Sequence, residues 1–135
     1  MRIALVIVLT LLAPAQVAAT RWLGSDACGS CHPAQLAGWR QTAHARAADR
    51  LGARPRARCL ACHGTGDAPA GRTAALEVGC EACHGAGGEY AEDDVMRDPL
   101  LARALGLREA GASCAGCHRG TGTRLAPVDL KKAPH

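Results

Sequence analysis

Apolar positions are concentrated at the start of the 135-residue chain, in the run IALVIVLTLLA at 3–13. This run is shorter than the roughly 20 residues that span a bilayer. The small residues of VAA at 17–19 fit a signal cleavage site, so we expect residues 1–19 to be a secretory signal peptide removed after Ala19. The alternative is an uncleaved N-terminal anchor. We predict an exported protein, periplasmic or extracellular, with a single domain over 20–135 and no transmembrane segment after cleavage.

A long helix is predicted shortly after this leader. Pro33 fits the first turn, the run AQLAGWRQTAHARAADRL continues the pattern to Leu51, and Gly52 can end it. Gly38 is the weak point within it. The prediction is one continuous helix over 33–51.

A second helix is predicted at DPLLARALG (98–106), which has an acidic N-cap, a proline in the first turn and a glycine stop. The composition of GTGDAPAGRT (64–73) and GAGGE (85–89) is typical of loops. Strand signals are limited to weak runs such as AALEV (74–78). The predicted fold is mostly α-helical, with extensive loops and little or no sheet.

Large aliphatic residues are scarce beyond the leader. Residues 20–135 contain eleven Leu, three Val, no Ile and no Phe. A chain of this composition cannot build a sufficient core from its own side chains. It needs another component to fold around.

All eight cysteines fall into one repeated motif, Cys-x-x-Cys-His. The four copies are CGSCH (28–32), CLACH (59–63), CEACH (80–84) and CAGCH (114–118). The motif is the attachment signature of c-type haem, in which two thiols add to the porphyrin vinyl groups and the histidine ligates the iron. Four disulfides or zinc sites would also account for eight cysteines. Neither predicts a histidine after the second cysteine of every pair.

We therefore predict four covalently attached haem c groups, which form the core of a small multihaem cytochrome c. The attachment residues are Cys28, Cys31, Cys59, Cys62, Cys80, Cys83, Cys114 and Cys117. The proximal iron ligands are His32, His63, His84 and His118. Because folding then depends on haem, the haem-free chain is expected to be largely unfolded.

The charge of the chain does not indicate a nucleic-acid partner. The formal net charge is +4, and haem propionates would bring the holoprotein close to neutral or acidic. We interpret the arginines at 46, 50, 54, 56 and 58 as propionate partners and solvated surface.

Candidate sixth ligands are fewer than the predicted irons. The candidates are the spare histidines His44 and His135 and the methionine Met96, while Tyr90, Lys131 and Lys132 are of rarer ligand types. At least one haem is therefore expected to lack an intrachain sixth ligand.

His32 and His44 are not expected to share one iron. On a straight helix they would be about 18 Å apart along the axis, whereas two imidazole nitrogens on one metal lie about 4 Å apart. If His44 is a ligand, it serves a different haem, and the predicted helix holds two haems apart.

The segments CGSCHPAQLAGWRQTAHARA (28–47) and VGCEACHGAGGEYAEDDVMRDPLLARALGL (78–107) resemble the cytochrome c-554 family of tetrahaem electron carriers. The Trp39–Thr42–His44 pattern and the Cys-Glu-x-Cys-His-Gly motif are the most specific parts. The resemblance implies a mostly helical fold around haems stacked in pairs.

The resemblance also implies a ligand set. His44 would ligate the fourth haem and His135 the third, while the second haem, on the motif that ends at His63, would be high-spin and five-coordinate. Relatives often have a histidine shortly after the third motif that ligates the first haem, and this chain has GGEYAEDD there. The first haem's sixth ligand is therefore open among Met96, Tyr90, a neighbouring subunit or none.

The predicted function is transfer of electrons between a donor and an acceptor redox protein. No constellation of acid, base or nucleophile independent of haem is present, so an electron carrier is favoured over an enzyme. One alternative is a reductase of nitric oxide, nitrite or hydroxylamine at an open haem. Another is self-association into a dimer or a conducting filament, in which a neighbour supplies a missing histidine.

Overall fold

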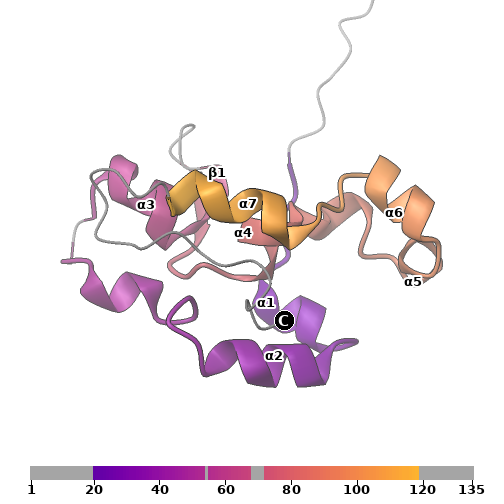
Figure 1. Cartoon of the computed structure of the whole chain (residues 1–135), viewed down its shortest axis with the longest axis horizontal. Coiled ribbons are helices and arrows are strands. Elements are labelled where there is room, and N and C mark those ends of the chain that lie inside the picture. Colours follow the sequence, from indigo (N-terminus) through magenta and orange to yellow (C-terminus); the bar gives the residue numbers. More distant parts are fainter. Residues whose placement is uncertain (1–19, 54, 68–71, 119–135) are drawn as a thin grey trace, which may run out of the picture.

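The computed structural model describes residues 20–53, 55–67 and 72–118. In this part of the chain, short helices are joined by loops (Figure 1). The elements are α1 (Ser25–Gly29), α2 (Pro33–Arg40), the 3-10 helix η1 (Ala47–Arg50), α3 (Ala57–His63), β1 (Thr65–Asp67), β2 (Arg72–Ala75), α4 (Cys80–His84), the 3-10 helix η3 (Gly87–Glu89), α5 (Asp93–Met96), α6 (Pro99–Ala104) and α7 (Ala110–Cys117). The fold is mostly α-helical, as predicted. The expected signal peptide lies outside the described residues.

Each Cys-x-x-Cys-His motif lies on a turn of helix. α3 and α4 end at the histidine of their motif. In the first and fourth motifs, the backbone N–H of His32 and of His118 donates to the carbonyl of Cys28 and of Cys114, each at 2.9 Å. An i to i+4 bond of this kind places the first cysteine and the histidine one helical turn apart.

The helix predicted over 33–51 is wrong beyond Arg40. Thr42 donates both its backbone N–H and its hydroxyl to the carbonyl of Trp39, at 2.8 and 2.7 Å. These bonds close a tight turn where the helix would have continued. There is consequently no straight helix between His32 and His44, and the expected rigid spacer between two haems does not exist in that form.

The helix predicted over 98–106 is confirmed as α6. The side chain of Asp98 accepts hydrogen bonds from the backbone N–H of Leu100 at 3.0 Å and of Leu101 at 3.1 Å, as an N-cap residue should. Gly106 follows the helix with a φ of 112°, which favours glycine.

The segment predicted as a loop over 64–73 contains a strand. β1 pairs antiparallel with β2 in a two-stranded sheet, with Gly66 opposite Thr73. β2 also includes the start of the weak run at 74–78. The prediction of little or no sheet agrees with this small hairpin.

The motif-bearing helices pack against one another in sequence-distant pairs. α4 packs against α1 and α7, and α7 also packs against α3. α5 packs on α6, and Figure 1 places this pair at the end of the molecule away from α3.

Few apolar side chains are buried by the polypeptide. Within the described residues, the buried apolar ones are Tyr90 and Ala102, while Leu76, Leu100 and Leu101 are exposed. The expected shortage of a side-chain core is confirmed for this part of the chain. Across the described ranges, no helix is both long enough and apolar enough to cross a membrane.

Candidate metal centres

The four motifs form a continuous row in space. The contacts of α1 with α4, of α4 with α7 and of α7 with α3 give the order first, third, fourth, second. Burial, with the nearby thiol of Cys80 and carboxylate of Glu81, raises the pKa of Cys28 to about 11. Burial and Cys114 likewise raise the pKa of Cys83. Both influences act between motifs that these helix contacts make neighbours, the first with the third and the third with the fourth.

The cysteines fit covalent attachment of haem. None of the eight forms a disulfide, and each is partly or fully exposed. Within the described residues, no group of three or more His, Cys, Asp or Glu side chains could hold a separate metal ion. Those residues therefore contain neither disulfides nor a zinc cluster.

The structure brings His44 to His118. Their ring centroids are 6.1 Å apart, with an angle of 83° between the ring planes. Burial and the nearby His118 lower the pKa of His44, which favours the neutral imidazole. Two imidazole nitrogens on one metal lie about 4 Å apart, with each ring centre further out. The observed separation is therefore compatible with one iron between the two rings.

Val78 holds the segment that carries His44. Its backbone N–H donates to the carbonyl of His44 at 3.1 Å, and its carbonyl accepts from the indole Nε1 of Trp39 at 2.9 Å. Together with the turn at Thr42, these bonds explain the Trp39–Thr42–His44 pattern. The residues of this pattern form the turn at which the chain leaves α2 and runs back toward the fourth motif.

Two of the motif histidines have a backbone carbonyl at Nδ1. His63 Nδ1 is 2.6 Å from the carbonyl oxygen of Ala47, and His84 Nδ1 is 3.0 Å from that of Arg108. Because a carbonyl only accepts, Nδ1 is the donor in each of these hydrogen bonds. Contacts of this kind fix the tautomer and orientation of an iron ligand. The residues fit haem in this respect also.

The acceptors at Ala47 and Arg108 were not predicted, because the sequence does not reveal which carbonyl a distant turn will present. Glu81 was also missed as an individual residue. It is 1% exposed, and its carboxylate accepts backbone hydrogen bonds from Leu23, Gly24 and Gly87. A sequence signal for it does exist. Among the eight residues between paired cysteines, Glu81 is the one with a charged side chain.

The remaining ligand candidates are placed less favourably. Tyr90 donates its hydroxyl to the carbonyl of Gly85 at 2.7 Å, and burial, with Cys28 and Glu81 nearby, raises its pKa to about 12. The Tyr90 hydroxyl is thus held as a neutral hydrogen-bond donor. Met96 is the last residue of α5 and is half-buried. His135 lies outside the described residues.

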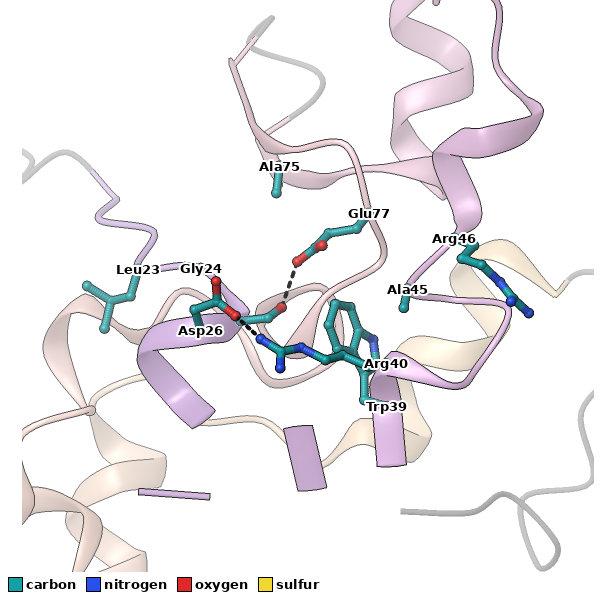
Figure 2. Close-up of a pocket in the computed structure, with 10 residues that line it drawn as sticks. Leu23, Gly24, Asp26, Trp39, Arg40, Ala45, Arg46, Ala75 and Glu77 are labelled. Atoms are coloured by element: carbon teal, nitrogen blue, oxygen red, sulfur yellow. Dashed lines mark hydrogen bonds and ion pairs between the residues drawn. The ribbon is translucent and has the colours of Figure 1, made fainter. Parts of the chain in front are cut away.

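A surface pocket of about 560 Å³ lies beside the first motif (Figure 2). Arg40 crosses it to pair with Asp26 at 2.7 Å, and Ser25 donates to Glu77 at 2.8 Å. Its lining includes Trp39 but no cysteine or histidine. This pocket is therefore separate from the haem-attachment residues.

Residues 27–85 match the family described as cytochrome c554 and c-prime. The matched segment contains the first three motifs and His44, and it ends directly after the third motif. Comparisons with curated proteins and with solved structures find no match to the chain. The family match confirms the resemblance drawn from the motifs. It supports a c-type cytochrome that transfers electrons with covalently bound haem c.

Proposed function

On the premise that this chain is a c-type cytochrome similar to the cytochrome c554 family, we propose that it is an exported electron carrier with four covalently attached haems. The haems would be held by the four Cys-x-x-Cys-His motifs, with His32, His63, His84 and His118 as proximal ligands. Its partners would be a donor and an acceptor redox protein outside the cytoplasm.

The observation that carries this proposal is the unbroken row of motif helices. Each motif helix contacts the next in the order α1, α4, α7, α3. Haems attached to neighbouring helices would themselves be neighbours, so electrons would pass along the row. The chain therefore provides a path between two sites on its surface, as a carrier requires.

The bound haem would supply an iron that alternates between the ferric and ferrous states. The chain would supply ligands whose rings are held by hydrogen bonds. The hydrogen bonds of His63 and His84 to Ala47 and Arg108 restrict ring rotation. His44, held through Val78, would complete the coordination of the fourth iron opposite His118.

Fewer contacts support an assignment of the sixth iron ligand in the other three haems. His135 would serve the third haem, as the family resemblance implies. Met96, a neighbouring subunit or no sixth ligand is left for the first haem, because the Tyr90 hydroxyl is engaged at Gly85. The second haem would be five-coordinate.

Two measurements on the mature holoprotein test the proposal. Its mass, with a pyridine haemochrome assay, should give four haems per chain. A low-temperature electron paramagnetic resonance spectrum should contain both low-spin signals and at least one high-spin ferric signal. Fewer than four haems would overturn the tetrahaem assignment, and four low-spin haems in a monomer would overturn the open position.

One observation favours a second function, reduction of a small nitrogen oxide. Among the described residues, His44 is the one histidine outside the motifs, and its ring lies beside that of His118. Among the described residues the first, second and third motifs have no such partner, and the family resemblance implies that the second iron is the one open to nitric oxide, nitrite or hydroxylamine. The high-spin signal should then shift on addition of nitric oxide, and turnover with a reductant should follow. A shift without turnover would mean that the protein is an electron carrier and not a reductase.

A further inference from the structure

A buried carboxylate lies between the first and third motifs. Glu81 belongs to α4, between Cys80 and Cys83, and its side chain is 1% exposed. It extends to Leu23 and Gly24, which directly precede α1 and the first motif. The haem-attachment roles described above do not use this residue.

The carboxylate of Glu81 accepts hydrogen bonds from three backbone N–H groups. Its Oε1 accepts from the backbone N–H of Leu23 at 3.0 Å and of Gly87 at 2.7 Å. Its Oε2 accepts from Leu23 at 3.1 Å and from Gly24 at 2.8 Å. All of these partners are donors, and they occupy both oxygens, so a carboxyl proton would face an N–H group. The site is built for the anion.

No cation is bonded to this carboxylate among the ion pairs of the described residues. Arg108 is the cation whose charge also reaches this cluster, since it opposes the rise in the pKa of Cys83 and Tyr90. Its side chain is exposed, so solvent screens it more than it screens Glu81. The negative field of Glu81 is therefore only partly compensated.

We propose that Glu81 is a fixed negative charge that lowers the reduction potentials of the haems on the first and third motifs. One-electron reduction adds a negative charge at each iron, with the electron coming from the donor protein of the proposed function. A buried anion nearby opposes that step. Net charge, hydrogen bonding and burial around a haem are established determinants of its potential.

The size of the effect follows from the electrostatics of a partly buried site. A unit charge roughly 10 Å away, at an effective dielectric constant of about 20, changes an equilibrium constant by about tenfold or more. For a one-electron couple, tenfold corresponds to about 59 mV. The haems of the second and fourth motifs are expected to respond less, because the hydrogen bonds of Glu81 run to residues beside the first and third motifs.

The test is a spectroelectrochemical titration of the mature holoprotein with the Glu81→Gln substitution. Two of the four haems should titrate at higher potential, each with about a tenfold larger equilibrium constant for reduction. The matched control is Glu89→Gln, which removes the same charge from an exposed position in η3. The control should shift every haem by less than about threefold, since exposed charges are screened.

A second variant tests the proposal if the Glu81→Gln protein does not fold with its haems. Leu23→Lys keeps the backbone N–H that binds Glu81 and adds a cation beside it, because the Leu23 side chain already lies against Gly87. The same two haems should again shift upward. Unchanged potentials in the variants that mature would overturn the proposal, as would shifts equal to those of Glu89→Gln.

The proposal rests on the tetrahaem function, and the experiment separates the two. The haem count of the wild-type protein is measured first. A count below four would refute the tetrahaem assignment itself. Four haems with unchanged potentials in the variants would refute the role of Glu81 alone.

Discussion

Val78 determines where His44 lies, although it has no chemistry of its own. Both of its backbone polar groups bond to the segment between Trp39 and His44. A residue on the approach to the third motif thus positions the side chain that faces His118 in the fourth. This coupling of distant segments is what the sequence alone could not reveal.

Removal of His44 gives the first residue-scale prediction. We expect His44→Ala to convert one haem of four from low-spin to high-spin, because His44 is the ring opposite His118. Electron paramagnetic resonance of the ferric holoprotein measures the change. Gln41→Ala, an exposed position in the same turn, should leave the spectrum unaltered. An unchanged low-spin content in His44→Ala would remove His44 from the ligand set.

Substitutions at two glycines give a second residue-scale prediction, in which the free energy of unfolding changes in opposite directions. Gly85 has a φ of 87°, and a Cβ there would lie 2.7 Å from the carbonyl oxygen of Gly106. We expect Gly85→Ala to lower the free energy of unfolding by about 2 kcal/mol or more.

Gly38 provides the comparison for that substitution. It lies within α2, and a Cβ there would meet no other atom within 4 Å. We expect Gly38→Ala to raise the free energy of unfolding by about 0.5 to 1 kcal/mol. Denaturant unfolding of both holoproteins checks the pair. Equal effects would contradict the backbone conformation at Gly85.

At the scale of elements, the sequence predicted a helix correctly where the residues that begin and end it are adjacent to it in the chain. α6 was predictable because Asp98, Pro99 and Gly106 are contiguous with it. The end of α2 was not, because the segment up to Leu51 has adequate helix propensity. Thr42 and the distant Val78 stop the helix at Arg40 instead. Tertiary hydrogen bonds outweighed a local preference.

The N-cap of α6 gives the element-scale prediction. Asp98→Ala removes the acceptor for the backbone N–H groups of Leu100 and Leu101. We expect the free energy of unfolding to fall by about 1 kcal/mol. Chemical denaturation measures it, with Asp94→Ala as the control at an exposed position in α5. A loss equal to that of the control would mean that the cap contributes nothing.

At the scale of the whole molecule, the composition anticipated the lack of a side-chain core. Eleven leucines and three valines after residue 19 are too few, and the described part buries just Tyr90 and Ala102 among its apolar residues. The attachment residues are predicted from the sequence, since their spacing is local. The spatial order of the motifs required the structure, because it depends on contacts between helices.

Haem removal gives the prediction for the whole molecule. We expect the chain made without haem to lack a cooperative thermal transition, since its polypeptide buries few apolar groups. Circular dichroism during heating would measure this, with the holoprotein as the comparison. A sharp unfolding transition in the haem-free chain would show that the polypeptide folds by itself.

The order of the motif helices in space differs from their order along the chain, and this has a consequence for biosynthesis. A chain grows from its N-terminus, so the second motif emerges before the α7 surface against which α3 packs. The first and third motifs can meet as soon as α4 exists. A haem-loaded chain truncated after Leu107 would therefore retain one pair of neighbouring motifs, and it would leave the second motif without its docking surface.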